Sequence, residues 1–208
     1  MNDIFVLDNP LPPELVDEIE DAVTHPSVPW YFCWTHNEDT IKNKDSIPGI
    51  IVPDTNKCLP SPRMVHLIHS DRYPECSTML PLMVDASNSI LNHLEMEVDY
   101  FKIQLTYMNN HTKVKEDCFN IPHVDRLGQS TEWNLVYYIN ESDGDTFFFN
   151  ERYDGTVQKE VTLRHRLSPK KGSAVVFKDE IFHASQNPIK SDFRFTMNAN
   201  FRLINHNK

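Results

Sequence analysis

The N-terminal residues carry two patterns of apolar positions. Residues 3–7 form a short apolar run bounded by polar residues, which predicts a strand. The Pro12-Pro13 pair is followed by apolar residues at helical spacing, and proline is well suited to the first turn of a helix. The pattern therefore predicts a helix from about Pro13 with apolar positions at Leu15, Val16, Ile19 and Val23.

The rest of the N-terminal half alternates between apolar and polar segments. Residues 29–34 (PWYFCW) are a dense aromatic run, which we expect to be a buried strand. Residues 35–62 are polar and rich in proline, which predicts a long loop and a candidate lid over a site. Residues 63–69 are expected to form a strand, and residues 80–94 have the apolar spacing of a helix.

The pattern changes in the C-terminal half, where short runs rich in β-branched and aromatic residues alternate with turn residues. Several such strands at regular spacing favour an antiparallel sandwich or jelly roll. We therefore expect a single mainly β domain over residues 1–208, with a helical and loop support region at 1–98 and a double-stranded β-helix core at 99–205. The expected strands of this half are 101–108, 133–139, 146–149, 157–163, 174–177 and 193–203.

Composition and charge narrow the class of protein. Apolar residues make up 39% and charged residues 24% of the chain, as in an ordinary globular protein. The net charge of −10 makes nucleic acid a poor first partner, because a phosphate backbone is repelled by an acidic surface. The N-terminus has no signal-peptide pattern, and no apolar run approaches the ~18 residues of a membrane span. The expected location is the cytoplasm, with reduced thiols at Cys33, Cys58, Cys76 and Cys118.

Three side chains could form an iron site. His123 and Asp125 lie two positions apart, so both point to one face of an extended segment. His183 follows the expected strand 174–177 and could meet them if two sheets pack face to face. Two histidines and one carboxylate form the facial triad of non-haem Fe(II) oxygenases. A second His-x-Asp at His69 precedes the β-rich half and leads into a polar turn, so we expect it to be a surface or packing residue.

From about residue 101 to residue 201 the sequence resembles the prolyl 4-hydroxylase-like branch of the 2-oxoglutarate/Fe(II) dioxygenases. The N-terminal half, with its PWY segment and polar loop, is similar to compact members of that family found in bacteriophages, which would place the protein in a host cytoplasm. The matching motifs occur in the family's order: HVD at 123–125, LVYYIN at 135–140, GDTFFF at 144–149, PKKGSAVVF at 169–177, HASQNP at 183–188 and RFTMNANF at 194–201.

The resemblance implies cofactors and roles for particular residues. His123, Asp125 and His183 would bind Fe(II), with 2-oxoglutarate as co-substrate and O2 as oxidant. Arg194 follows His183 by eleven residues, close to the family's spacing, and would meet the distal carboxylate of 2-oxoglutarate. Tyr138 would reach the same molecule from the cofactor face of its strand.

The resemblance implies two further cofactor contacts. Thr196 would touch the cofactor from the strand of Arg194. Tyr107 would correspond to the tyrosine that precedes the family's His-x-Asp motif, although the fifteen residues between Tyr107 and His123 exceed the family's usual spacing.

Three functions are compatible with these residues. The resemblance favours a hydroxylase acting on a small molecule or peptide, in particular a peptidyl or free amino acid such as proline. The presence of Asp125 supports hydroxylation, because the related halogenases lack this carboxylate. An AlkB-like nucleic-acid demethylase uses a similar motif set, but its second arginine lies closer to the first than Arg202 lies to Arg194. A catalytically inactive β-helix that acts as a binding module is the third alternative.

Overall fold

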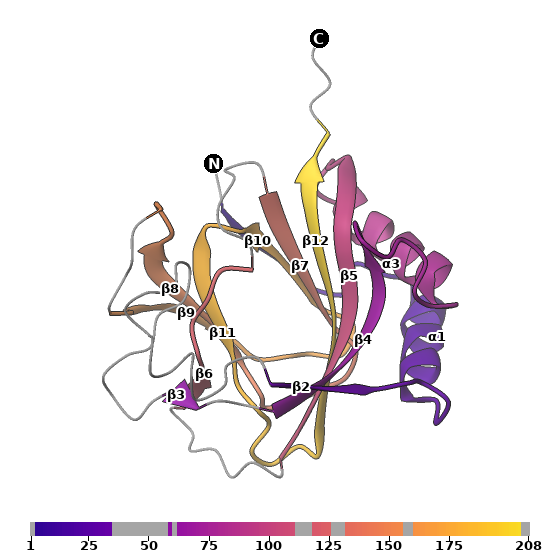
Figure 1. Cartoon of the computed structure of the whole chain (residues 1–208), viewed down its shortest axis with the longest axis horizontal. Coiled ribbons are helices and arrows are strands. Elements are labelled where there is room, and N and C mark those ends of the chain that lie inside the picture. The colour runs from indigo at the N-terminus through magenta and orange to yellow at the C-terminus, as the bar shows by residue number, and fades with distance from the viewer. Residues whose placement is uncertain are drawn as a thin grey trace.

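Two antiparallel sheets face each other in the computed structural model of this chain, and two helices lie against the outer face of the larger sheet (Figure 1). The structure describes residues 3–34, 58–59, 62–110, 118–125, 132–155 and 160–204, and the statements below refer to these residues. The helices are α1 (Pro13–Thr24) and α3 (Leu80–Asn92). The strands are β1 (Ile4–Leu7), β2 (Tyr31–Trp34), β3 (Cys58–Leu59), β4 (Pro62–Ser70), β5 (Val98–Asn109), β6 (Phe119–Asn120), β7 (Glu132–Tyr138), β8 (Thr146–Arg152), β9 (Leu163–Leu167), β10 (Ala174–Lys178), β11 (Ile181–Ser185) and β12 (Phe193–Leu203).

The larger sheet has the strand order β1-β10-β7-β12-β5-β4-β2, so strands from both halves of the chain share it. β12 pairs with β5 on one side and with β7 on the other. Its side chains alternate between apolar and polar, and successive residues of a strand point to opposite faces. One face of the larger sheet is therefore apolar, and the other is polar near β12. The apolar positions of β12 are Phe193, Phe195, Met197, Ala199 and Phe201, and the polar ones are Arg194, Thr196, Asn198 and Asn200.

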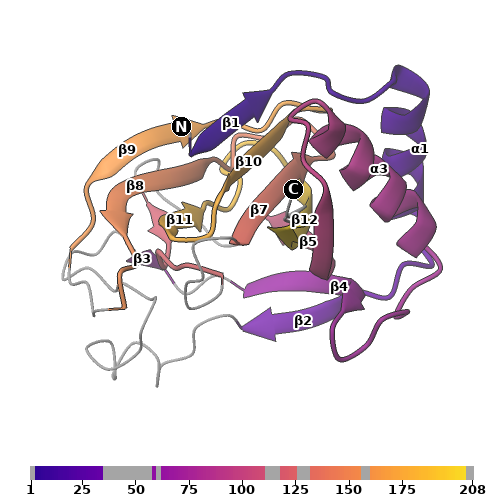
Figure 2. The ribbon, with the colours of Figure 1, turned by 90° about the horizontal axis from the view of Figure 1, so that it is seen from above.

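The main hydrophobic core lies between the helices and the apolar face of this sheet. α1 contributes Ile19 and Val23, and α3 contributes Met83 and Ile90, all without exposed surface. Figure 2 shows both helices on one side of the larger sheet, away from β8 and β9. No helix among the described residues has the length and hydrophobicity needed to cross a membrane.

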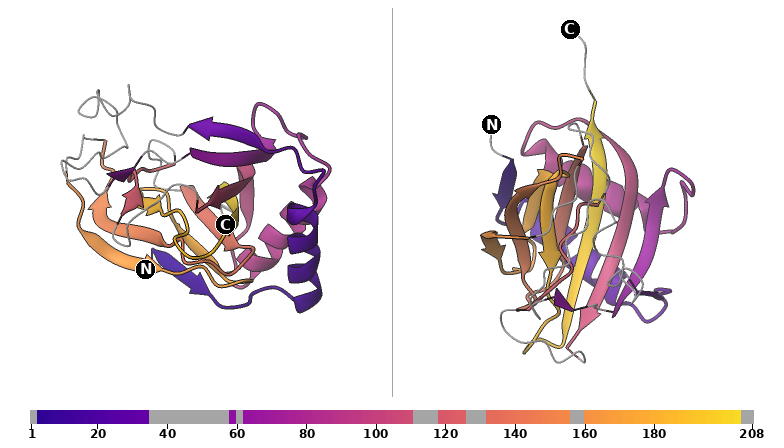
Figure 3. Two further views of the ribbon diagram at one scale, coloured as in Figure 1. Left: turned by 90° about the horizontal axis from the view of Figure 1, so that it is seen from below. Right: turned by 60° about the vertical axis from the view of Figure 1, so that its left-hand side comes forward.

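The smaller sheet, β11-β8-β9, covers only part of the polar face of the larger sheet. Its residues Phe148 and Ile181 pack against Val136 of β7 and against Val175 and Phe177 of β10. Figure 3 shows β2 and β4 at the far side of the larger sheet from β8 and β9. The smaller sheet thus closes the β1 side of the sandwich, and a cavity remains between β12, β5 and β4 on one side and β11 on the other.

The expected mainly β jelly roll with flanking helices is confirmed, but two strand predictions were wrong. β2 lies at the edge of the larger sheet, where Tyr31 is 64% and Phe32 57% exposed, because an aromatic run does not reveal whether another layer covers it. Of the strand expected at 157–163, residues 157–159 lie outside the described residues, and the strand there, β9, runs from Leu163 to Leu167. Its residues Arg164, His165 and Arg166 are exposed, so it lacks an apolar signature. The short strand β11 was not predicted. The candidate lid at 35–62 lies almost entirely outside the described residues.

The alternation along β5 predicts a large difference between adjacent positions. Ile103→Ala removes a fully buried side chain from the helix-facing core and should lower the free energy of unfolding by about 2–5 kcal/mol. Gln104→Ala, at the next position, faces the cavity and should cost less than about 1 kcal/mol. Urea unfolding of the two variants measures the difference, and similar losses would show that the face assignment is incorrect.

Candidate active site

His123 and His183 are held side by side by direct pairing of their backbones. The amide of His123 donates to the carbonyl of His183 at 3.0 Å, and the amide of His183 donates to the carbonyl of His123 at 3.0 Å. Residues that exchange both hydrogen bonds lie directly opposite each other, with side chains on the same face. The two imidazole ring centres are consequently 4.7 Å apart.

Each imidazole is oriented by a backbone carbonyl. Nδ1 of His123 lies 2.9 Å from the carbonyl oxygen of Ile121, and Nδ1 of His183 lies 3.1 Å from that of Ile181. Since a carbonyl only accepts, Nδ1 carries a hydrogen in both rings, and Nε2 is the nitrogen left to bind a metal ion. Burial lowers the pKa of His123 to about 3, the neighbouring His183 lowers it further, and Asp125 opposes both effects. His123 is therefore a neutral imidazole at neutral pH, the form that binds metal ions.

Asp125 completes the group and is itself held by a chain of polar side chains. Its Oδ1 lies 3.6 Å from Nε2 of His123, and its Oδ2 lies 3.9 Å from Nε2 of His183. Asn200 donates to Oδ2 at 2.9 Å and also contacts Oδ1 of Asn134 at 2.7 Å. Asn134 in turn donates to Asp179 at 3.1 Å. This chain fixes the orientation of the Asp125 carboxylate.

The charge state of Asp125 suits the same role. Burial raises the pKa of its carboxyl, but electrostatic interactions with His183, His123 and Lys102 and the hydrogen bond from Asn200 outweigh burial and bring the pKa to about 2. Asp125 is thus ionised over the physiological pH range.

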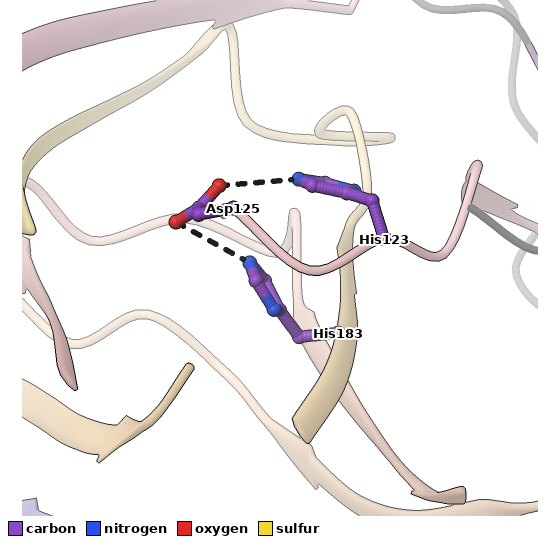
Figure 4. A group of neighbouring side chains, drawn as sticks. All are labelled: His123, Asp125 and His183. Atoms are coloured by element: carbon purple, nitrogen blue, oxygen red, sulfur yellow. Dashed lines mark ion pairs between the residues drawn. The ribbon is translucent and has the colours of Figure 1, made fainter. Parts of the chain in front are cut away.

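The three side chains converge on one point (Figure 4). One donor atom from each lies within 4.8 Å of the others, and no further group of three or more histidine, cysteine or acidic side chains of this kind occurs among the described residues. Two imidazole nitrogens and one carboxylate oxygen are the donor set of a facial triad, which leaves coordination positions open. The residues present therefore fit an Fe(II) ion.

Arg194 lies in the same cavity and is 3% exposed. Its Nη2 donates to Oγ1 of Thr146 at 3.0 Å, and the hydroxyl of Tyr138 donates to the same oxygen at 2.8 Å. Its side chain passes close to Gly144, where an added Cβ would lie 2.9 Å from Cδ of Arg194 and 2.7 Å from the carbonyl oxygen of Gln186. Glycine at position 144 thus gives the arginine the space to reach the cavity.

The guanidinium of Arg194 lacks a carboxylate partner among the described residues. No carboxylate oxygen of that part of the chain lies within 4 Å of it, and its buried Nε has no hydrogen-bond partner. Burial lowers its pKa, but a guanidinium stays charged in proteins. A buried unpaired charge is costly, so the arrangement favours binding of an anion at this end of the cavity.

The other two predicted cofactor contacts on this side, Thr196 and Tyr138, occupy different positions relative to the cavity. Thr196 lines the cavity, and Tyr138 lies behind Arg194, whose guanidinium carbon is 5.8 Å from the tyrosine ring centre. Burial raises the pKa of Tyr138, although Arg194 opposes this, so the phenol stays protonated. That these two residues contact 2-oxoglutarate stays a prediction.

The prediction for Tyr107 does not agree with the geometry. Its ring lies on the opposite face of β5 from the cavity-lining Thr106 and Met108, and it stacks on Phe195 with ring centres 4.9 Å apart. The two faces of a strand alternate, so Tyr107 cannot share the face of its neighbours.

At the second His-x-Asp, both ring nitrogens of His69 lie near backbone carbonyls, of Pro74 and Tyr100, as expected for a packing residue.

Several cavity residues were not identified from the sequence. Asn200 and Asn198 could have been found, because they continue the alternation that starts at Arg194. Thr146 lies in the quoted GDTFFF motif but was given no role. Arg63 of β4 also lines the cavity, and only the strand pairing brings it there.

Sequence comparison gives no relatives: no protein-family profile and no curated protein matches this chain. Comparison of the fold, in contrast, finds similar solved structures. A prolyl-4-hydroxylase from Pseudomonas putida has a TM-score of 0.52 at 15% identity, over 99% of this chain and 95% of that one. A prolyl hydroxylase from Trichoplax adhaerens, in complex with a hypoxia inducible factor peptide, has a TM-score of 0.58 at 11% identity, over 97% and 84% of the two chains.

A third similar structure differs in its chemistry. The epimerase SnoN, in complex with Fe3+, alpha ketoglutarate and nogalamycin RO, has a TM-score of 0.60 at 11% identity, over 97% of this chain and 79% of that one. The similar structures thus include enzymes that act on peptides and on small molecules. At these identities the similarity concerns the fold alone: the chain has the jelly-roll fold that 2-oxoglutarate-dependent oxygenases share.

Proposed function

We propose that the protein is a dioxygenase that depends on Fe(II) and 2-oxoglutarate and hydroxylates an unactivated C–H bond. The observation that carries this proposal is that one cavity combines a facial triad with a buried arginine that has no carboxylate partner among the described residues. The triad alone would suit several metal-dependent proteins. A dianionic co-substrate requires both a metal and a distant positive charge, and the cavity offers both.

Different residues of the chain would bind the metal and the co-substrate. His123, Asp125 and His183 would hold Fe(II), which together with 2-oxoglutarate and O2 supplies the oxidising chemistry. Arg194 would bind the distal carboxylate of 2-oxoglutarate with its fork of donors. Thr146 accepts a hydrogen bond from the guanidinium, and the hydroxyl of Tyr138 donates to the same Thr146 oxygen. Asn200 keeps one oxygen of Asp125 occupied and leaves the other available to the metal.

The net reaction would convert substrate, O2 and 2-oxoglutarate to hydroxylated substrate, succinate and CO2. The protein's contribution is to orient the substrate and to exclude water, and the buried aromatic residues Phe148 and Phe177 beside His183 serve the second purpose. The substrate we propose is a peptidyl or free amino acid such as proline. Two of the similar structures are prolyl hydroxylases, and the order of the sequence motifs points the same way.

Anaerobic titration with Fe(II) and 2-oxoglutarate tests the cofactor assignment. We expect a visible charge-transfer band in the wild type and no band in His183→Ala. Arg194→Lys should need about tenfold more 2-oxoglutarate, because lysine cannot offer the paired donors of a guanidinium. Arg202→Lys, at the exposed end of the same strand, is the matched control and should behave like the wild type.

The opposite result has a clear meaning. If no band forms, and iron binds no more tightly to the wild type than to His183→Ala, the protein is a binding module built on an oxygenase fold. Salt-dependent binding of methylated oligonucleotides would instead support the nucleic-acid demethylase.

The hydrogen-bonded side chains of Asn200 and Asn134 behind Asp125 lead to a separate prediction about metal affinity. Asn200→Ala frees the carboxylate to rotate and should weaken Mn(II) binding about 10–100-fold, the usual range for residues that orient metal ligands. Asn150→Ala, at an exposed position of β8, is the control and should leave affinity unchanged. Electron paramagnetic resonance of free Mn(II) measures both. Equal affinities in Asn200→Ala and the wild type would rule out a positioning role.

A further inference from the structure

The cavity has a second wall, formed by β4 and β5, that the triad and Arg194 do not use. The strand pairing places Val65 opposite Thr106 and Leu67 opposite Gln104. Paired residues lie on the same face of a sheet, so Arg63, two positions before Val65, points to the cavity as well. Arg63 and Gln104 both line the cavity together with His123 and Asp125. Lys102, two positions before Gln104 on β5, shares this face.

This wall remains accessible in the part of the chain that the structure describes. The smaller sheet packs on β1, β7 and β10, where Val136, Val175 and Phe177 are buried. Arg63, Lys102 and Gln104 are instead partly exposed. A ligand could therefore lie against β4 and β5 beside the metal position.

The wall is positively charged. Among the described residues, no carboxylate oxygen lies within 4 Å of Arg63 or of Lys102, and the buried Nε of Arg63 has no hydrogen-bond partner. Burial lowers the pKa of Lys102 and the nearby Arg63 lowers it further, while Asp125 and Cys33 oppose both effects. Both groups lie on the cavity face of the sheet: Arg63 precedes Met64, which pairs with Tyr107, and Lys102 pairs with Ser70.

The cofactors do not neutralise this charge. The charges of Fe(II) and of the 2-oxoglutarate dianion cancel, and Asp125, the one carboxylate lining the cavity in the described part of the chain, balances Arg194. In the described part of the chain, the cavity with both cofactors bound therefore keeps a net positive charge from Arg63 and Lys102, which have no carboxylate within 4 Å. Two partly desolvated cations gain stability from an anion that hydrogen-bonds to them, and a guanidinium binds carboxylate or phosphate oxygens in a bidentate manner.

We propose that the substrate carries an oxyanion of its own, a carboxylate or a phosphate group, which Arg63 and Lys102 bind while the reacting carbon faces the metal. This inference rests on the proposed function and narrows it. An uncharged residue inside a peptide, such as an internal proline, offers no such group. A free amino acid or another small acid does, and is the class of substrate that the wall fits.

Nuclear magnetic relaxation of a small anion tests the proposal without turnover. Mn(II) replaces Fe(II), because a paramagnetic ion accelerates relaxation of nearby nuclei. The protein is first loaded with Mn(II) and 2-oxoglutarate, and loading is checked by electron paramagnetic resonance. Failure at this stage contradicts the proposed function. Loaded protein is then titrated with inorganic phosphate, observed by 31P, and separately with acetate, observed by 1H, at constant ionic strength.

We expect enhanced relaxation of at least one of the two anions, and the one that binds more tightly identifies the oxyanion of the substrate. Arg63→Met and Lys102→Met should each load Mn(II) and 2-oxoglutarate as the wild type does but bind the anion about tenfold more weakly. Arg63→Lys should restore part of the binding. Arg72→Met, which removes an exposed arginine in the turn after β4, should change nothing.

Two results would overturn the inference while leaving the proposed function intact. The first is equal relaxation enhancement in the wild type, Arg63→Met and Lys102→Met, which would mean that the anion binds the metal directly. The second is loss of 2-oxoglutarate loading in Arg63→Met with Arg63→Lys restoring it, which would assign Arg63 to the co-substrate.

Discussion

The two-residue alternation of β12 is the constraint on which the rest of the structure depends. This strand is paired along both edges, so its residues can face only the helix-covered core or the cavity. Its apolar set anchors the sheet on α1 and α3, and its polar set supplies Arg194 at one end of the cavity and Asn200 at the other. Folding of the core therefore fixes the Arg194 end of the cavity and the support of the Asp125 carboxylate in a single step.

The polar face carries an energetic cost that helps to explain its chemistry. Burying a guanidinium without an anion, and holding two further cations near the same cavity, opposes folding. The hydrogen bond to Thr146 offsets part of this cost for Arg194. Such a cavity gains most from ligands that are themselves negatively charged. The affinity for a dianionic co-substrate and for an acidic substrate would then have one electrostatic origin.

The two histidines are positioned by hydrogen bonds between their backbones. They belong to separate segments, and the reciprocal amide–carbonyl pair between them sets their distance independently of any metal. The carbonyls of Ile121 and Ile181 then select the same tautomer in both rings. The site is consequently preorganised by backbone hydrogen bonds, whereas Asp125 depends on the side chains of Asn200 and Asn134.

The sequence by itself determined the jelly-roll class and singled out His123, Asp125, His183 and Arg194, which the fold brings to one cavity, because alternation and short motifs are local patterns. It did not reveal the exposure of β2, the position of β9, or that Tyr107 points away from the cavity. Each of these depends on which layer covers a strand or on the exact register of a pair. The positive wall of Arg63 and Lys102 likewise exists only because β4 joins β5 in the folded sheet. Local periodicity fixes which face a side chain takes, and only the tertiary structure decides what that face meets.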